Sequence, residues 1–431
     1  ENPEAGIDLF LEKLAQETEK NHEDILEQAD ETDAVFGELY SWYLRNPEYR
    51  SRVQKLVQAA FAGKPKDIIS QSVAKALYGE VSPYSATRLE RFAACAFAHF
   101  LQYGMKLTER VEYEFKPMDM GNVMHGALES FAEEVRKRGM KWTELTEQER
   151  NEIADRCLDN IVADYGNTVL KSSARNEYMI ERTRRILRRT VWALQKQLEQ
   201  GEFQPEGFEV TFGGGRIDRV DIMEDQNKVY VKVIDYKTGN TSFDLVYLYH
   251  GLQLQLMIYL DGALRVEQKK YPDKEIIPAG VFYYNIKDPM IQEKIDADVE
   301  AVSAGLMKEL KMNGLVQADS ELVYRMDSSL GSIPVAFNKD GSFRKNSSVA
   351  DRTQFAVLGR YVRTKIEKIR SSILEGDAEV SPYELGKRNA CTYCPYMTVC
   401  GFDRRLSGYE FRRLKNFSDE ELWKAFDREA E

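Results

Sequence analysis

The residues best suited to chemistry lie in two short segments, residues 215–221 (GRIDRVD) and 233–239 (VIDYKTG). Alternate side chains of a strand share one face, so Asp235 and Lys237 are predicted to project together while Tyr236 points away. If the two segments pair through a turn near residues 224–227, Asp218 comes alongside Asp235. The pattern therefore predicts two carboxylates and one ammonium group at a single place on a sheet.

Two carboxylates in this arrangement can share a divalent cation, and their hard oxygen atoms suit Mg²⁺ or Mn²⁺. The cation would polarise a phosphoryl oxygen and lower the pKa of a bound water, while Lys237 positions that water and offsets the developing negative charge. This is the chemistry of phosphodiester hydrolysis. An Asp-x-Lys pattern alone is more often a surface ion pair, so the companion residues decide between the two interpretations.

Three companion residues lie on predicted helices. His125 ends the segment GNVMH, and Gln255 and Tyr259 are four residues apart further along the chain. Residues spaced in this way line one helix face, so Gln255 and Tyr259 are predicted to face the site together. The alternative for Tyr259 is a core position with a bonded hydroxyl group. His125 is a candidate third metal ligand only if its helix lies over the sheet, because a lone histidine is more often structural.

The cysteines suggest a second metal centre. Cys391, Cys394 and Cys400 lie in one short loop, and Cys95 can supply a fourth thiolate from far away in the sequence. Zinc and iron-sulfur clusters both accept four thiolates, and the spacing alone does not separate them. Either group would close a very long loop and stabilise the fold. Cys157 lies in a helical, partly apolar context and is predicted to be unligated.

The surrounding sequence predicts an α/β fold with a sheet core embedded in helices. Residues 1–80 form a helical lead-in, and residues 81–431 form one domain whose first helix begins after Ser85 as N-cap. The strands are expected at residues 208–212, 216–223, 229–236 and 279–286, the intervening helix at 245–260, and further helices between 121 and 200 and between 292 and 374. Glycines 213–215 are expected to weaken the second strand and to shorten its hairpin.

Composition limits the classes of function. A net charge of −11 and a pI near 5.3 argue against a protein that coats nucleic acid through its overall charge, although a local basic groove remains compatible with DNA binding. The chain shows no apolar stretch of about twenty residues and no apolar leader, so we expect an intracellular protein without a membrane partner. Its first residue is not Met, and we expect it to be part of a longer protein.

Taken in order, Gly121-x-x-x-His125, the Asp218 and Asp235-Tyr236-Lys237 segments, and Gln255-x-x-x-Tyr259 resemble the motifs of RecB-family PD-(D/E)XK nucleases. With Cys95 and the three late cysteines, the chain is most similar to the iron-sulfur AddB-type branch of that family. The resemblance implies a restriction-endonuclease-like fold. It also implies metal ligation by His125, Asp218, Asp235 and the Tyr236 carbonyl, with Lys237 as catalytic lysine, Gln255 and Tyr259 in support, and Gln253 as an alternative to Gln255.

The same resemblance implies that Cys95, Cys391, Cys394 and Cys400 hold a [4Fe-4S] cluster. It implies a Mg²⁺- or Mn²⁺-dependent DNA exonuclease in the bacterial cytoplasm, which processes double-strand breaks by trimming the 5′-ended strand. The implied partners are an AddA-type helicase-nuclease and the single-stranded DNA made by unwinding, with residues 1–80 as the tail of a helicase-like region. The alternative is a catalytically silent module that binds DNA ends or a partner. The complete set of Asp218, Asp235 and Lys237 favours the enzyme.

Overall fold

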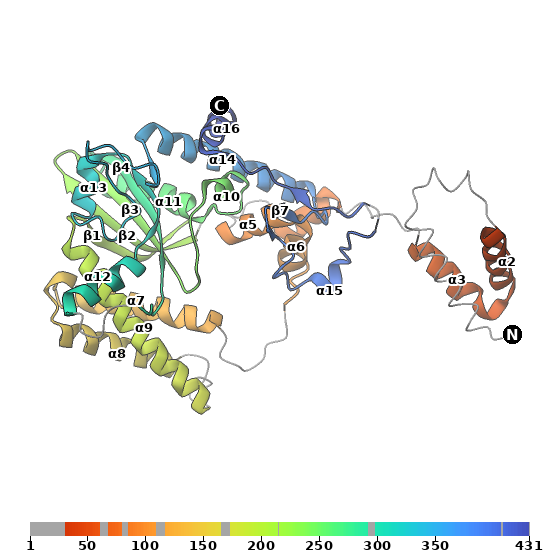
Figure 1. Cartoon of the computed structure of the whole chain (residues 1–431), viewed down its shortest axis with the longest axis horizontal. Coiled ribbons are helices and arrows are strands. Elements are labelled where there is room, and N and C mark those ends of the chain that lie inside the picture. The colour runs from red at the N-terminus through yellow and green to blue at the C-terminus, as the bar shows by residue number, and fades with distance from the viewer. Residues whose placement is uncertain are drawn as a thin grey trace.

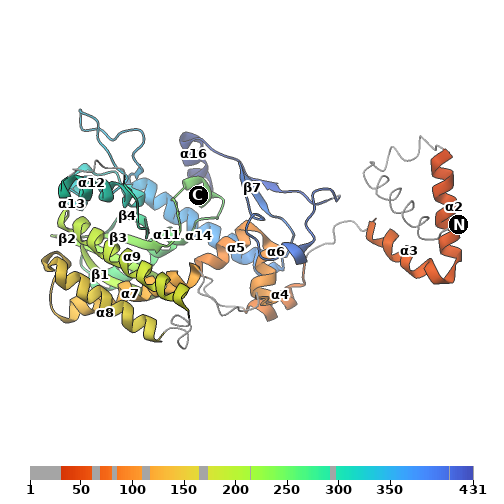
Figure 2. The ribbon, with the colours of Figure 1, turned by 60° about the horizontal axis from the view of Figure 1, so that its bottom comes forward.

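The computed structural model describes residues 31–60, 68–79, 85–108, 117–164, 173–213, 215–291, 298–406 and 408–430. The first thirty residues of the predicted lead-in lie outside this part. The described lead-in is helical, as predicted, and consists of α2 (Glu31–Arg45), α3 (Pro47–Ala60) and α4 (Gln71–Tyr78). In both whole-chain views α2 and α3 lie apart from the rest of the chain (Figures 1 and 2). No helix in the described ranges is long and apolar enough to cross a membrane.

A six-stranded mixed sheet forms the centre of the molecule, and its strands lie side by side in chain order. The first three are antiparallel, β3 and β4 are parallel, β4 and β5 antiparallel, and β5 and β6 parallel. The bounds are β1 (Gln204–Phe212), β2 (Gly215–Asp225), β3 (Lys228–Lys237), β4 (Glu275–Asn285), β5 (Asn313–Gln317) and β6 (Val349–Ala350). The predicted fold class, a mixed sheet flanked by helices, is confirmed. Strands β5 and β6 lie where we expected only helix and loop.

Both faces of the sheet are apolar, which explains why helices cover each of them. In β3 the side chains of Val231 and Val233 enter one core, while those of Ile234 and Tyr236 enter the other. The second core lies between the sheet and the helices on the lower left of Figure 1. These are α7 (Pro117–Lys137), α8 (Glu147–Asp164) and α9 (Ala174–Glu199), with the short 3-10 turn Trp142–Glu144, α12 (Val299–Glu309) and α13 (Ser320–Met326) nearby.

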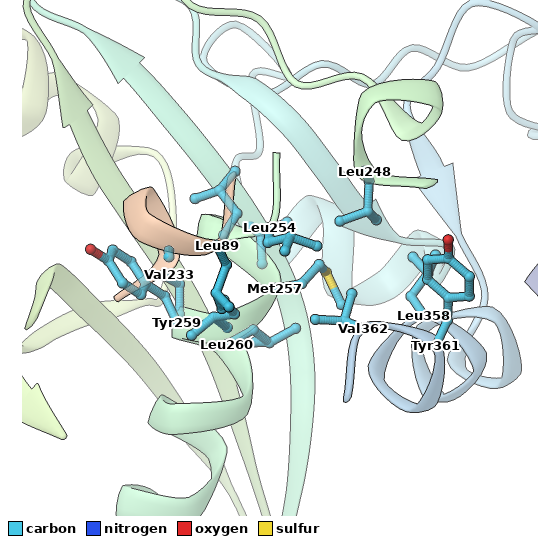
Figure 3. Packing of buried hydrophobic residues seen from close by; sticks show 14 of the residues in the cluster. Leu89, Val233, Leu248, Leu254, Met257, Tyr259, Leu260, Leu358, Tyr361 and Val362 are labelled. Carbon is cyan, nitrogen blue, oxygen red and sulfur yellow. The ribbon is translucent and has the colours of Figure 1, made fainter. Parts of the chain in front are cut away.

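The first core lies between the sheet and a second group of helices. Figure 3 shows Val233 of β3 among Leu89, Met257 and Val362, which come from three different helices. The helices of this group are α5 (Ala86–Ala94), α10 (Leu245–Tyr249), α11 (Gln255–Lys270), α14 (Arg352–Glu375) and α16 (Asp419–Ala430). Ser85 caps α5 as predicted, since its Oγ accepts the Arg88 N–H at 3.4 Å.

The helix predicted over residues 245–260 is wrong as a single element. The chain leaves the helix after Tyr249, turns at Gly251 with a φ of +77°, and starts α11 at Gln255. A left-handed φ of this kind favours glycine. The break lets α11 begin directly over the end of β3, so that its first residues face the sheet.

The strands on either side of the glycine run at 213–215 are not shortened, contrary to our expectation, while Gly214 itself lies outside the described residues. Strands β1 and β2 stay paired up to Phe212 and Gly215. Gly215 has a φ of +150°, and a Cβ there would lie 3.4 Å from the Tyr259 ring. Gly215 therefore lies close to α11 in a backbone conformation that favours glycine.

Helix α4 packs with the body of the molecule, although it precedes the predicted boundary at residue 80. Ala74 and Tyr78 are part of the first core. The Ile69 N–H also donates to the Gly376 carbonyl at 3.0 Å, just beyond α14. The division of the chain at residues 80 and 81 stays a prediction, but residues 68–79 pack on the domain that follows.

The late cysteines lie on a small irregular unit next to α5, seen in dark blue in Figure 2. A three-stranded sheet of order β8-β7-β9 supports it. Its elements are β7 (Tyr383–Leu385), β8 (Arg388–Asn389), α15 (Met397–Cys400) and β9 (Arg412–Arg413), packed near α6 (Ala96–His99) and the π-helical turn Phe100–Gly104.

Candidate active site and cysteine centre

The pairing of β2 with β3 brings the two predicted carboxylates to neighbouring strands. Arg219 is the partner of Ile234 in the register, so Asp218 and Asp235 come next along the same two strands. One Asp218 oxygen, Oδ2, accepts the backbone N–H of Tyr236 at 2.7 Å. The predicted pairing through the turn at residues 224–227 is therefore confirmed.

Asp235 and Lys237 project to one face of β3, as their alternation predicts. Lys237 Nζ lies 2.6 Å from Asp235 Oδ2, and Asp235 is 2% exposed. The Tyr236 side chain points to the opposite core, where its ring contacts Tyr284. The Asp-x-Lys pattern is thus a largely buried pair beneath α11 and differs from a solvated surface ion pair.

Gln255 joins the members of this pair to each other. Its Oε1 accepts from Lys237 Nζ at 2.7 Å, and its Nε2 donates to Asp235 Oδ1 at 2.8 Å and to the Tyr259 hydroxyl at 2.9 Å. Burial raises the pKa of Tyr259 to about 12, so this hydroxyl stays protonated. Gln253 instead bonds to the Asp244 N–H and the Ser242 carbonyl. Of the two glutamines, only Gln255 contacts the predicted catalytic pair.

Asp235 has an unusual protonation equilibrium. Burial raises its pKa to about 7, the charge of Asp218 adds to the effect, and Lys237 opposes it. A carboxyl group with this pKa exchanges its proton near neutral pH. Perturbed groups of this kind are concentrated at functional sites.

His125 lies over the sheet and completes a cluster with two carboxylates. Its Nδ1 is 3.4 Å from Asp218 Oδ2 and 3.8 Å from Glu209 Oε1. One ligand atom from each of the three residues lies within 4.8 Å of the others, so the three could hold a cation together. Burial alone would lower the pKa of His125, but Asp218 and Glu209 outweigh it and raise the pKa to about 10. The His125 imidazole is therefore attracted by both carboxylates.

Glu209 is the site residue that our sequence analysis missed. It sits on β1 opposite Asp218, between the pairs Phe208–Arg219 and Val210–Ile217. Its φ of +48° is rare for a residue with a side chain, and the β1 register shifts just before it, between Pro205 and Gly207. Strand alternation does not place Glu209, because the shift and the left-handed backbone set its direction.

The metal ligands predicted by resemblance are only partly gathered in one cluster. His125 and Asp218 lie within it, and Glu209 joins them. The Asp235 oxygens are bonded to Gln255 and Lys237. Their part in holding a cation, like that of the Tyr236 carbonyl, stays a prediction.

Four cysteines meet in one apolar pocket. Cys95 lies at the end of α5, and Cys391, Cys394 and Cys400 lie across from it. Burial raises the pKa of Cys391 to about 11, and the three other thiols add to the effect because they are its neighbours. Cys157 is buried in the other core, far from this pocket in the fold.

A model of the PD-(D/E)XK nuclease superfamily matches residues 83–401, which include the paired carboxylates, Lys237 and all four clustered cysteines. The chain belongs to this superfamily.

Relatives of this PD-(D/E)XK chain are named as a subunit of an ATP-dependent helicase/deoxyribonuclease. The protein of Lachnoclostridium phytofermentans is 41% identical over 93% of the chain, and the match covers 36% of that protein. The proteins of Thermoanaerobacter pseudethanolicus and Clostridium novyi are each 34% identical, over 93% and 99% of the chain and over 37% and 40% of their own lengths. The PD-(D/E)XK chain thus spans little more than a third of the length of these relatives.

Proposed function

We propose that this chain is the nuclease region of a helicase–nuclease protein and hydrolyses DNA phosphodiester bonds with the help of Mg²⁺ or Mn²⁺. The observation that carries the proposal is the joint arrangement of Asp218, Asp235 and Lys237 under Gln255. The superfamily match and the name of the relatives support it. Within this proposal the reaction is exonucleolytic and trims the 5′-ended strand at double-strand breaks.

The donor set fits a hard divalent cation. Carboxylate oxygens of Asp218 and Glu209 and a ring nitrogen of His125 converge, and Asp235 lies on the adjoining strand. Carboxylate and carbonyl oxygens suit Mg²⁺ and Mn²⁺ better than soft metals. We assign His125, Asp218 and Glu209 as ligands, joined by Asp235 and the Tyr236 carbonyl. A bound cation would polarise the scissile phosphoryl group and acidify a water molecule.

The remaining residues orient the water and handle charge. Lys237 is placed to hold the attacking water and to offset the negative charge that develops on the phosphoryl oxygens. Gln255 fixes the Lys237 ammonium group against Asp235, and Tyr259 fixes Gln255 from its other side. Only one quarter of the Lys237 side chain is exposed, at 27%, so it enters the site from a restricted direction.

The decisive experiment compares Lys237→Ala with the matched variant Lys274→Ala. Lys274 also pairs with a carboxylate, Glu224 at 2.7 Å, but far from the cluster along the sheet. With Mg²⁺ and a strand-labelled DNA duplex, we expect Lys237→Ala to lower the cleavage rate about a hundredfold or more and Lys274→Ala to leave it unchanged. Removal of the metal with a chelator should stop cleavage in every variant. DNA binding by the intact protein without cleavage would instead support the silent-module alternative.

We further propose that Cys95, Cys391, Cys394 and Cys400 hold a [4Fe-4S] cluster. Sulfurs on one tetrahedral zinc ion lie about 3.8 Å apart, because each Zn–S bond is about 2.3 Å. Four thiolates in one pocket could hold zinc or a cluster, and the resemblance to the iron-sulfur branch of the family favours the cluster. Anaerobically purified protein should be brown and contain iron. Colourless protein with one equivalent of zinc would refute the cluster.

The partner that we propose is an AddA-type helicase-nuclease, which would deliver an unwound DNA strand. The relatives' name, which makes them part of a helicase/deoxyribonuclease, supports a complex of this kind. Co-purification of the full-length protein with such a partner, and loss of 5′-strand trimming in Lys237→Ala within the complex, would test both points. If trimming persists in Lys237→Ala, another active site of the complex must cut the 5′-ended strand.

A further inference from the structure

Helix α11 begins without a cap of its own. Its N-cap residue, Leu254, has no side-chain oxygen to accept the free N–H groups of the first turn. Glu90 of α5 replaces this cap from another helix, since its Oε1 accepts the N–H groups of Leu254 at 2.7 Å and Gln255 at 2.9 Å. A carboxylate at this position also interacts favourably with the positive end of the helix dipole.

One of the two N–H groups that Glu90 accepts belongs to Gln255, the residue that organises the proposed active site. The side chain of Gln255 contacts Lys237, Asp235 and Tyr259, all at 2.7–2.9 Å. Burial raises the pKa of Glu90 to about 7, and the nearby charge of Lys237 lowers it while that of Asp235 raises it. Glu90 therefore lies within electrostatic reach of the catalytic pair while its oxygen stays on the backbone of α11.

The other end of the same short helix is part of the cysteine centre. Helix α5 spans nine residues, and Cys95 is its C-cap. Arg91, the residue after Glu90, places Nη2 3.7 Å from Cys394 Sγ and its guanidinium 5.6 Å from the Tyr396 ring centroid. Any group that binds the four sulfurs therefore also fixes the position of α5.

We propose that Glu90 is a positioning residue, which connects the cysteine centre to the nuclease centre by holding the first turn of α11 and hence the Gln255 amide. The inference rests on the proposed nuclease function. It assigns to the cysteine centre an effect on catalysis that needs no electron transfer. Reactions that depend on alignment lose about 10²-fold in rate for a shift near 1 Å, so a small movement of Gln255 is sufficient.

The test uses full-length protein in its complex, with Glu90→Ala, Glu90→Gln and the matched variant Asp319→Ala. Asp319 also accepts two backbone N–H groups at a helix start, those of Glu321 at 3.0 Å and Leu322 at 3.1 Å, but on the far face of the sheet. In a strand-resolved assay we expect Glu90→Ala to lower kcat about 10- to 100-fold with little change in KM. Glu90→Gln should restore most of kcat, because its amide oxygen can accept the same bonds. Asp319→Ala should leave kcat near the wild-type value.

A second measurement does not depend on cleavage. Amide hydrogen exchange measured without added Mg²⁺ or Mn²⁺ should speed up about tenfold or more at Leu254 and Gln255 in Glu90→Ala, with unchanged iron content. If wild-type protein fails to cleave DNA, the proposed function is wrong. The exchange result still tests the contact between Glu90 and the first turn of α11. If Glu90→Ala does not fold, Glu90→Asp, one methylene shorter, should show the same losses.

Three outcomes would overturn the inference. The first is a normal kcat with normal exchange in Glu90→Ala. The second is an equal loss of kcat in Asp319→Ala, because then any lost cap would suffice. The third is a Glu90→Gln variant as slow as Glu90→Ala, because that would assign the effect to charge rather than to position.

Discussion

At the scale of single residues, two buried aspartates of the same sheet behave in opposite ways. Asp235 is 2% exposed, and its pKa is raised to about 7, by burial first and by Asp218 second. Asp221 is fully buried, and burial would raise its pKa too, but Arg219 and Lys232 outweigh burial and lower it. One carboxylate is therefore held at a cost to the fold, whereas the other is stabilised by two cations.

The first prediction follows from this contrast. The pKa of Asp235 in the folded protein is about 7, whereas an unfolded aspartate has a pKa near 4. The metal-free fold therefore loses stability as the pH rises from about 4 to 7, and this loss persists above pH 7. Asp235→Asn should therefore raise the free energy of unfolding by about 2 kcal/mol at pH 8, have little effect at pH 4, and abolish cleavage. Denaturant titrations in a chelator at both pH values measure this.

Asp221→Asn provides the control of opposite sign. Its lowered pKa means that the stabilisation is present above about pH 4 and lost on acidification. In the native protein, Arg219 Nε and Lys232 Nζ lie 2.5 and 3.0 Å from the Asp221 carboxylate oxygens. Removing the charge of Asp221 leaves both cations buried without their anionic partner. The loss should be about 3–5 kcal/mol at neutral pH. Destabilisation by both variants at pH 8 would contradict the assigned difference between the two aspartates.

At the scale of elements, what the sequence predicted and what it missed have distinct physical causes. Strands β1 to β3 were predictable because β-rich segments separated by short turns mark them. The five-residue β5 and the two-residue β6 carry too little alternation to be recognised. Helices α10 and α11 were merged because the apolar residues keep a helical spacing through the break at Gly251, where only the positive φ reveals the turn.

The same limits apply to the site. Asp218, Asp235 and Lys237 could be predicted because each depends on one strand pairing, and Gln255 and Tyr259 because they are one helical turn apart. Glu209 and Glu90 could not. The direction of Glu209 depends on a local backbone distortion, and Glu90 meets α11 across 165 residues of sequence.

The second prediction concerns Gly376, the residue at the end of α14 that contacts the segment before α4. It has a φ of +92°, and a Cβ there would lie 2.0 Å from the Ile69 carbonyl oxygen. Gly376→Ala should therefore cost about 2–4 kcal/mol, from the strained backbone and from the displaced segment together. Thermal unfolding of the two proteins gives the difference.

Gly341→Ala is the matched control for that substitution. Gly341 also has a positive φ, +82°, but nothing lies within 4 Å of the added Cβ. Gly341→Ala should lower the free energy of unfolding only by the cost of the strained backbone, about 1–2 kcal/mol. Equal losses in both variants would mean that the packing of residues 68–79 contributes nothing to the stability of the domain.

At the scale of the whole molecule, the cysteine centre brings together two parts of the domain that are far apart in the sequence. About 300 residues separate Cys95 from Cys391. A crosslink that closes a loop of this length is expected to stabilise the fold by about 5 kcal/mol, as long as the closed geometry is unstrained.

The third prediction tests that contribution with Cys95→Ala and the control Cys157→Ala. Both residues are buried, but only Cys95 lies in the four-cysteine pocket. Cys95→Ala should lose bound iron and lower the melting temperature by about 10 °C or more, whereas Cys157→Ala should keep its iron. A Cys95→Ala protein that retains both the iron and the melting temperature would remove Cys95 from the centre.

The separation of these cysteines has a consequence for how the protein is made. Synthesis proceeds at about 5–20 residues per second, so Cys95 leaves the ribosome roughly 15 to 60 s before Cys391 does. The β2–β3 hairpin with its two aspartates can form within that interval, because all of its partners have already emerged. Any group that needs all four sulfurs must instead wait until Cys400 has emerged, which leaves Cys95 as an unligated thiol until then.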